Sequence, residues 1–344
     1  MKVNGLTESD EVARRDVRVT FADVAKAAGV STATVSYVLS GRAGVSVTQP
    51  TRQRVMREAE RLGYRRNSIA SSLRKGETRT VAIVSTHLSG ASVTRGNYVK
   101  DMMLALCVAA SGAGLNVVMT VDKSLGELRV EDVTDRRVDG IVVFGIYGAE
   151  HWMRAVLRTG IPCVEINSYY GGCVVATDNA LGARQGVEHL RVLGHRRIAY
   201  VDTTKETDSA RLRRAGFCDA AASSGEPLLL RDWDRVPALV RSAAGPTGLV
   251  CYNDEAAAEM IDRLTADELR VPEDVSVVGF DNSMICDFVR PRLTSIENPV
   301  EMLAGRSLAL LQRQIAGESL GDLTEVVPTR LVTRASVAAP AAGR

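Results

Sequence analysis

The sequence predicts a small all-α headpiece followed by a larger α/β body with two lobes. Two short helical segments joined by a tight turn, within residues 20–40, predict the headpiece. From residue 80 onward, short apolar segments alternate with helical ones, which predicts parallel sheets covered by helices. Because about 260 residues is long for a single unit of this kind, we expect two lobes with a cleft between them.

The segment 20–40 has the pattern of a helix-turn-helix. Thr20 and Asp23 form a capping-box pattern, and Gly29 ends the first helix because glycine enters the left-handed region without steric cost. Ser31 can cap the second helix. The apolar residues expected to share one core are Val24, Ala25, Ala28, Val35, Val38 and Leu39. A second helix of this kind enters a DNA major groove, although the pattern also suits a helical hairpin in an unrelated bundle.

A third helix is expected at about residues 51–62, with Gly63 at its end. Its inner stripe comprises Val55, Ala59 and Leu62, and its outer face carries Arg52, Arg54, Arg57 and Arg61. The following segment, 65–76, is basic and rich in serine, and a helix that begins at Asn67 would be too short to be stable alone. This segment is either one that folds on DNA or a plain linker.

Charge and composition limit the possible functions. Residues 1–79 contain 15 lysines and arginines and 8 acidic residues, whereas the remainder contains 28 and 33, so a basic head joins a mildly acidic body. The six cysteines are scattered without a Cys-x-x-Cys pair, and no metal or other cofactor is expected. The chain shows no signal core and no apolar run of about 18 residues, so we expect a cytoplasmic protein without a membrane partner.

The expected strands of the body are residues 81–85, 117–121, 140–144, 163–166, 198–201, 248–252 and 275–280. Ligands of open α/β sheets bind beyond the carboxyl ends of the strands. Asn253 and Asp254 follow one expected strand, and Asp281 and Asn282 follow another. These polar residues are therefore candidates for a binding site. The chain contains no phosphate-binding loop, nucleophile elbow or dinucleotide fingerprint, and we expect that it is not an enzyme.

Several motifs along the chain resemble those of one family. They are VTFADVAKAAGVS at 19–31, TVSYVLS at 34–40, RVDGI at 137–141, TDN at 177–179, EHLRVLGHRRIA at 188–199, RAGF at 214–217, NDE at 253–255 and VPEDVSVVGFD at 271–281. In this order they resemble the LacI (lactose repressor) family of bacterial transcription regulators, from residue 20 to about residue 337.

The resemblance implies a division of the chain into a DNA headpiece, a hinge and a sensor similar to a periplasmic sugar-binding protein. The implied parts are a disordered tail 1–18, headpiece 19–64, hinge helix and linker 65–79, effector-binding and dimerisation domain 80–337 and disordered tail 338–344. Within the sensor, the first lobe is about 80–193 and 298–326, and the second is about 194–297 and 327–337.

The resemblance also assigns residues to DNA. Those implied to contact bases are Thr32, Ala33 and Tyr37, and those implied to contact phosphates are Thr20, Ser31, Thr34, Ser36 and Thr51. Asn67 and Leu73 match hinge positions, and Leu73 is implied to wedge into the minor groove. Three features at the DNA end depart from the family: Arg66 replaces a usual proline, the segment 46–51 is about two residues longer than usual, and Tyr37 stands where many relatives carry arginine. The alternative for Tyr37 is packing against the headpiece core.

For the effector, the resemblance implies a site at Arg213, Asn253 and Asp281, which suits a sugar or a related metabolite. The alternative for each is a structural hydrogen bond or salt bridge. Asp178 either meets the ligand or caps the following helix. The first lobe lacks the family's aromatic pattern, which leaves His87 and Tyr98 as candidates, and a sensor that binds nothing is a further alternative.

Together these features predict a repressor that binds a palindromic DNA operator as a homodimer. A small-molecule effector in the cleft would switch it by changing the angle between the lobes. No leucine-heptad tail follows the sensor, which argues against a terminal coiled coil. The competing classes are an enzyme and a pure sugar-binding protein, and the headpiece argues against the latter.

Overall fold

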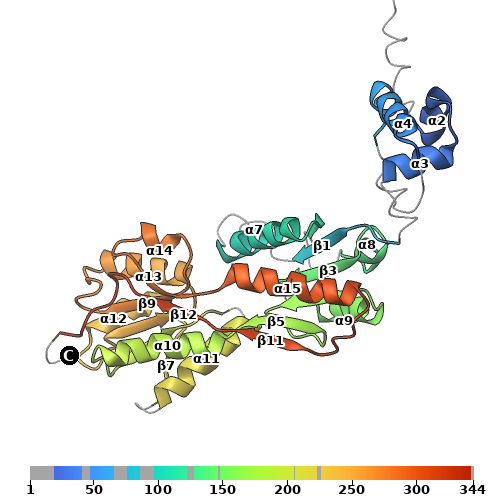
Figure 1. Ribbon diagram of the computed structural model, residues 1–344. Helices are drawn as coiled ribbons and strands as arrows, with labels where there is room; N and C mark the ends of the chain where they lie inside the picture. The colour runs from blue at the N-terminus through green and yellow to red at the C-terminus, as the bar shows by residue number, and fades with distance from the viewer. Residues whose placement is uncertain are drawn as a thin grey trace, which may run out of the picture. The chain divides into compact units, whose positions relative to one another are not determined.

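The computed structural model divides into two compact units, residues 1–76 and 77–344 (Figure 1). The structure describes residues 19–40, 47–65, 76–85, 97–121, 128–145, 148–204, 206–222 and 226–341. Four positions named above lie outside these described residues: Arg66, Asn67, Leu73 and His87.

Three helices make up the described part of the first unit. They are α2 (Phe21–Ala28), α3 (Thr32–Ser40) and α4 (Gln49–Arg61). The predicted capping box is present, because the Asp23 carboxylate accepts a hydrogen bond from the Thr20 amide at 2.8 Å while Thr20 Oγ1 accepts from the Asp23 amide. Gly29 ends α2 with a φ of +61°, in the left-handed region that the tight turn requires. The helix α4 begins earlier than predicted because Pro50 fits the first helical turn.

The headpiece core lies between these three helices. Its fully buried side chains are Val24, Ala25, Ala28, Val35, Val38, Val55 and Ala59. Phe21 stacks on Tyr64 with ring centroids 5.3 Å apart, and Arg54 Nε donates a hydrogen bond to the Ala28 carbonyl oxygen at 2.9 Å. The predicted helix-turn-helix is therefore confirmed, with α4 holding the two shorter helices at a fixed angle.

Within the described residues, two six-stranded sheets form the framework of the second unit. The first has the order β11-β5-β4-β3-β1-β2, from β1 (Thr80–Ser85), β2 (Asn116–Val121), β3 (Gly140–Phe144), β4 (Cys163–Ile166), β5 (Cys173–Thr177) and β11 (Thr324–Val327). The second has the order β12-β10-β9-β8-β6-β7, from β6 (Ile198–Val201), β7 (Leu228–Leu230), β8 (Gly248–Cys251), β9 (Ser276–Asp281), β10 (Thr294–Glu297) and β12 (Arg330–Val332). All neighbouring strands are parallel except β10 and β12.

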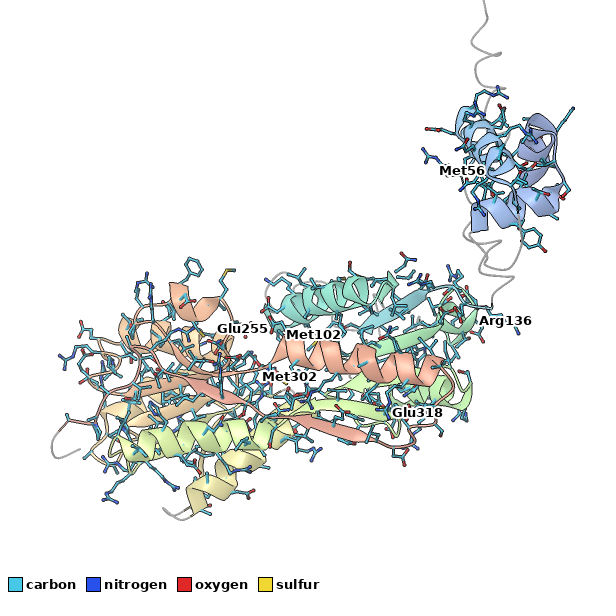
Figure 2. The ribbon with its side chains drawn as sticks, viewed as in Figure 1. Met56, Met102, Arg136, Glu255, Met302 and Glu318 are labelled. Carbon is cyan, nitrogen blue, oxygen red and sulfur yellow. The ribbon has the colours of Figure 1, made fainter. Side chains whose placement is uncertain are left out.

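Helices cover both faces of each sheet, as expected for buried parallel strands. The helices against the first sheet are α7 (Asn97–Gly112) and α15 (Val300–Ile315) on one face and α8 (Glu131–Thr134) and α9 (Glu150–Arg158) on the other. Those against the second are α10 (Asn179–Val192) and α11 (Asp208–Ala221) on one face and η2 (Trp233–Arg235), α12 (Val236–Arg241), α13 (Asp254–Ala266) and α14 (Ile285–Phe288) on the other. Met102 of α7 is fully buried against α15 (Figure 2).

The described chain passes between the sheets after β5, after β10 and again after β11. The helix α10 packs on the second sheet, where Ala183, Val187 and Leu190 join the core around Tyr200. The expected boundary at residue 193 therefore moves back to the end of β5, because the chain crosses before α10 and not after it. Val327 in turn stays in the core of the first sheet, so the last crossing follows it.

The strand prediction omitted β5, β7, β10, β11 and β12. The connection from β4 to β5 runs through residues 167–172, although the two strands are parallel neighbours. Parallel strands are usually joined by a crossover of a dozen or more residues, often a helix. Because this connection is too short for a helix, the alternation of strands and helices did not predict β5. The edge strands β7 and β12 contain three residues each and are partly exposed. Their apolar segments are therefore too short to predict strands from the sequence.

The C-terminal segment is anchored further than expected. His195 is buried, and its ring nitrogens hydrogen-bond to Thr247 Oγ1 at 2.9 Å and to the Ala338 carbonyl oxygen at 2.8 Å. The Ala338 amide also donates to Ser276 Oγ at 3.1 Å. The expected disordered tail at 338–344 is thus wrong at Ala338. No helix in the described part of the chain is both long and apolar enough to cross a bilayer.

Candidate functional site

The recognition helix α3 presents a polar face away from the headpiece core. Thr32 and Ala33 are exposed at its start, and Tyr37 is partly exposed one turn further. Tyr37 is absent from the described headpiece core, which argues against the packing alternative. The three residues implied to contact bases thus lie on α3 with their side chains wholly or partly open to solvent.

Most of the residues implied to contact phosphates lie at helix N-termini. Thr20 precedes α2, and Ser31 precedes α3, where its Oγ accepts a hydrogen bond from the Thr34 amide at 3.1 Å. Thr51 lies in the first turn of α4, and its Oγ1 accepts from the Thr48 hydroxyl at 2.9 Å. Helix N-termini carry free amides and a partial positive charge, which suit phosphate groups. The hydroxyls of Thr20 and Ser31 therefore cap α2 and α3, and phosphate contacts at these positions stay a prediction.

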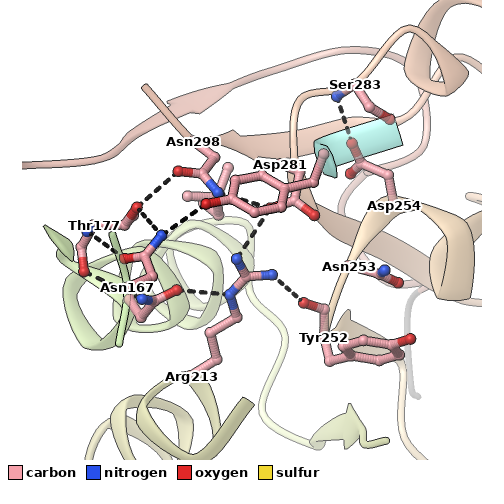
Figure 3. A network of polar contacts seen from close by, with 12 residues as sticks. Asn167, Thr177, Arg213, Tyr252, Asn253, Asp254, Asp281, Ser283 and Asn298 are labelled. Carbon is pink, nitrogen blue, oxygen red and sulfur yellow. Dashed lines mark hydrogen bonds and ion pairs between the residues drawn. The ribbon is translucent and has the colours of Figure 1, made fainter. Parts of the chain in front are cut away.

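In the second unit, a polar network gathers where strands of the two sheets end (Figure 3). Arg213 on α11 lies at its centre. Its Nη2 pairs with Asp281 Oδ1 at 3.0 Å, its Nε donates to Asn179 Oδ1 at 2.8 Å and its Nη1 donates to the Tyr252 carbonyl oxygen at 2.7 Å. The guanidinium also lies over the Phe280 ring, 3.6 Å from the centroid. Arg213 is thus held by partners from several elements.

The neighbours of Arg213 on α11 point elsewhere. Arg211 is exposed and pairs with Asp208 on the same helix. Arg214 pairs with the buried carboxylate of Asp202 at 2.8 Å and with Glu206. Arg213 is 6% exposed, and it pairs with Asp281. The structure therefore places Arg213, and not its neighbours on α11, beside Asp281, which is another of the predicted effector residues.

Asp281 adopts an unusual backbone conformation at the end of β9. Its φ is +109° and that of Asn282 is +52°, both in a region that residues other than glycine rarely adopt. Such strain persists only where the surroundings hold it, and it is frequent at binding sites. Asn298 holds Asp281 from the other side, since its Nδ2 donates to Asp281 Oδ1 at 3.1 Å.

A second carboxylate, Asp254, lies buried beneath the network at the start of α13. It accepts hydrogen bonds from the Ser283 amide at 2.6 Å and from Ser295 Oγ at 2.5 Å. Burial raises the pKa of the Asp254 carboxyl to about 7, and the charge on Asp281 contributes further. Asp254 therefore titrates near neutrality, directly behind the candidate site.

Two of the predicted effector residues serve as helix caps. Asn253 Oδ1 accepts from the Ala256 amide at 2.9 Å, and its Nδ2 donates to Glu255 at 2.7 Å. Asp178 Oδ1 accepts from the Leu181 amide at 2.8 Å at the start of α10. The capping alternative for Asp178 is therefore present, and a contact with a ligand stays a prediction for both residues.

A cavity of about 620 Å³ opens beside the network. Tyr98 of α7, from the first lobe, contributes to its wall together with Asp281, the last residue of β9, and Asn298, which follows β10. Asp101, Glu297 and Glu301 add carboxylates, and the rest of the wall includes the apolar side chains of Leu104, Ala105, Val108, Ala109 and Val300. Arg213 and Asn253 are outside the lining, so Arg213 stands behind Asp281 and supports it.

Sequence reasoning missed Asn167, Thr177 and Asn298. Asn167 Nδ2 donates to Tyr98 Oη at 3.0 Å, and Thr177 Oγ1 donates to Asn298 Oδ1 at 2.8 Å. Asn167 follows β4 directly and Asn298 follows β10, so the rule that selected Asn253 and Asp281 applies to both. The sequence of β10 has no apolar run, so it does not predict the strand that Asn298 follows. Thr177 appears in the sequence analysis only within the family motif TDN at 177–179.

Two aromatic side chains flank the same edge of the second sheet. Trp233 and Tyr252 have ring centroids 6.3 Å apart, and Trp233 Nε1 donates to the Asp202 carbonyl oxygen at 2.8 Å. The described residues contain no group of three or more histidines, cysteines or carboxylates placed to hold a metal ion. The site therefore consists of amides, carboxylates, hydroxyls and aromatic rings, a set that suits a polar organic molecule.

Comparisons with known proteins agree with this geometry. Residues 20–67 match the model of bacterial regulatory proteins of the lacI family, and residues 187–337 match that of the periplasmic binding protein-like domain. An HTH-type transcriptional regulator from Streptomyces limosus, itself uncharacterised, is 31% identical over 345 residues, which cover 92% of this chain and 94% of the relative.

Solved structures give the same result. The crystal structure of a lac repressor dimer bound to operator and the anti-inducer ONPF is similar, with a TM-score of 0.80, 26% identity and coverage of 93% of this chain and 99% of that one. The complex of the transcriptional regulator CelR with cellobiose matches with a TM-score of 0.66, 27% identity and coverage of 93% and 100%.

A helix-turn-helix headpiece joined to a two-lobed α/β domain defines a DNA-binding regulator with a periplasmic-binding-protein-like domain. The chain belongs to the LacI family of bacterial transcription regulators. Members of this family regulate transcription and are not enzymes.

Proposed function

We propose that this protein is a repressor that binds a palindromic operator as a homodimer and is switched by a small-molecule effector. The proposal rests above all on Asp281, whose backbone is strained and whose carboxylate faces a cavity. Residues from distant parts of the chain hold this carboxylate in place. The lac repressor dimer bound to operator and an anti-inducer offers a precedent for the same combination of partners.

At the DNA end, Thr32, Ala33 and Tyr37 read bases, and hydroxyls at the helix N-termini hold phosphates. The exposure of the first three on α3 supports this role. The headpiece is residues 19–64, and residues 65–79 form the hinge and linker. Asn67 belongs to this hinge, and Leu73 opens a minor-groove step there. Because the target is chromosomal DNA, the protein acts in the cytoplasm.

Exposed apolar side chains on the second unit support a homodimer. Met284 and Phe288, at α14, are 68% and 72% exposed. Large exposed apolar side chains mark protein interfaces. A second copy of the chain would cover them and supply the second headpiece that a palindrome needs.

The effector is a sugar or a related hydroxylated metabolite. The cavity beside Asp281 and Tyr98 offers carboxylates and amides, which bind hydroxyl groups, and Tyr98 itself contributes an aromatic ring. CelR in complex with cellobiose shows that a protein with this fold takes a sugar.

The proposal is tested by selecting DNA fragments from the host genome with the full-length protein and sequencing those that it retains. We expect one palindromic motif, with affinity that falls steeply as salt rises because phosphates dominate the contacts. No enrichment over a protein-free control, from folded protein, would contradict sequence-specific binding.

The selected fragment then serves to identify the effector. Simple sugars, cellobiose among them, are titrated into the complex of protein and DNA, and the bound fraction is followed by mobility shift. One of them should change operator affinity in the wild type but not in Asp281→Ala, which should still bind the fragment. A normal response in Asp281→Ala would remove Asp281 from the effector site.

A further inference from the structure

A continuous chain of hydrogen bonds joins the two lobes at the candidate site (Figure 3). In the first lobe, Asn167 Nδ2 donates to Tyr98 Oη at 3.0 Å and to Thr177 Oγ1 at 3.3 Å, while the Thr177 amide donates to Asn167 Oδ1 at 2.8 Å. The chain then leaves this lobe through the bond from Thr177 Oγ1 to Asn298 Oδ1 at 2.8 Å. Asn298 Nδ2 completes it at Asp281 Oδ1, at 3.1 Å. A second link runs from the Thr177 carbonyl oxygen through Asn179 and Arg213 to Asp281.

The charge at Asp281 fixes the direction of every bond in this chain. A carboxylate only accepts hydrogen bonds, so Asn298 must turn its NH₂ group toward Asp281. Its carbonyl oxygen then faces Thr177, whose hydroxyl has to donate to it. The Thr177 oxygen can in turn accept from Asn167. The three side-chain bonds from Asn167 through Thr177 and Asn298 to Asp281 therefore share one direction, from the first lobe toward the second, and such chains polarise one another.

The connecting residues are withdrawn from water. Thr177 is 2% exposed and Asn298 is 4% exposed, although Asn298 contributes, with Tyr98 and Asp281, to the wall of the cavity. A buried hydrogen bond that is broken leaves an unsatisfied polar group, which is costly. A change at Asp281 therefore cannot be absorbed locally by solvent, and it alters the bonds of Asn298, Thr177 and Asn167 in sequence.

We propose that Thr177 and Asn298 are positioning residues that carry the state of Asp281 into the first lobe as far as Tyr98. This relay deepens the proposed function and rests on it. An effector that donates a hydrogen bond to Asp281 competes with Asn298 for Oδ1. The released Asn298 amide then loosens the bonds of Thr177 and Asn167, and the first turn of α7, where Tyr98 lies, loses its anchor.

The test needs neither DNA nor effector. Amide hydrogen exchange of the first-lobe segment 163–177 is measured by mass spectrometry in the full-length chain. The variants are Asp281→Asn, Thr177→Val and the two combined. Asp281→Asn removes the charge that orients the chain, and it should speed exchange in this segment about fivefold, the effect of losing one hydrogen bond. In the Thr177→Val background, the same change should have a much smaller effect, because only the link through the Thr177 carbonyl oxygen, Asn179 and Arg213 remains.

Three matched variants sharpen the result. Thr177→Ser keeps the hydroxyl and should preserve the response to Asp281→Asn. Glu259→Gln removes one surface charge from the second lobe, outside the relay, and should leave segment 163–177 unchanged. If Thr177→Val does not fold, as judged by circular dichroism, Asn298→Ala takes its place, since it removes the next residue of the chain.

The outcomes separate the relay from the proposed function. If Asp281→Asn speeds exchange equally in the wild-type and in the Thr177→Val background, the relay is overturned, because a merely structural role gives additive effects. No response in any background overturns it as well. Failure of the wild type to retain any genomic fragment contradicts the proposed function, and the exchange data still decide on the relay.

Discussion

In the headpiece, the residues expected to touch DNA lie close together in sequence, between Thr20 and Thr51. The polar network of the cleft instead draws on residues from Tyr98 to Asn298. The hydroxyls of Thr20 and Ser31 cap the helices that follow them, so folding and the predicted phosphate contacts would share the same atoms. In the cleft, each side chain is held by partners from other strands and helices. Local order thus supports the first site, and tertiary contacts support the second.

The largest expected effect of a substitution is at Arg213. Arg213→Ala leaves the buried Asp281 carboxylate without its cation, and we expect a loss of about 3–5 kcal/mol in unfolding free energy. Arg211→Ala, on the same helix, removes only an exposed pair and should cost less than about 1 kcal/mol. Thermal and urea unfolding of both variants give the comparison, and equal losses would contradict the central role of Arg213.

Asp254 should make the stability of the second unit depend on pH. Because burial raises its pKa from 3.8 to about 7, the unfolded chain ionises first as pH rises, and the folded form loses stability between about pH 4 and pH 7. We expect a loss of roughly 2–4 kcal/mol across this window, with little further change above it. Unfolding of the wild type and of Asp254→Asn at several pH values checks this, since the contribution should vanish in the variant.

In the headpiece, Tyr37→Ala should weaken operator binding about tenfold by removing a base contact from α3. The stability of the headpiece should hardly change, because Tyr37 lies outside its described core. Met56→Ala is the control, since Met56 is 57% exposed on α4 (Figure 2) and has no expected contact with DNA. Equal operator affinities of the two variants would show that Tyr37 does not read DNA.

The smallest effect is expected at the first helix cap. Thr20→Ala removes the hydroxyl that accepts from the Asp23 amide, which should cost about 1 kcal/mol of headpiece stability. Thr20→Ser retains the cap and should restore it. If capping and phosphate binding share this hydroxyl, operator affinity should follow the same order, and a shift assay on both variants tests that link.

Local patterns in the sequence were sufficient to predict the headpiece. Capping residues, Gly29 and the apolar spacing all act within one or two turns, so the sequence contains the relevant contacts directly. The same holds for strands such as β3 and β6, which are single buried runs. The helix α4 starts before the predicted residue 51 because proline fits the first turn of a helix. The apolar pattern contains no information on this effect of Pro50.

The cleft was predictable only in part. Asp281 and Asn253 follow strands with strong apolar patterns, which made them visible. Asn298 follows β10, a strand of the sequence Thr-Ser-Ile-Glu that has no apolar run, and its partner Thr177 lies far away in the chain. Nor did the sequence predict that α10 packs on the second sheet, because that depends on which core accepts Val187 and Leu190.

The placement of the aromatic residues has a practical consequence for optical measurements. The chain contains two tryptophans, and each lobe carries one. Trp152 packs against the core beside α9 in the first lobe, whereas Trp233 faces Tyr252 in the second lobe. A Trp152→Phe variant would leave Trp233 as the only tryptophan, and selective excitation separates its emission from that of the eight tyrosines. Its emission would report on the second lobe alone, and the reciprocal Trp233→Phe variant would report on the first, so the response of each lobe can be recorded without any attached dye.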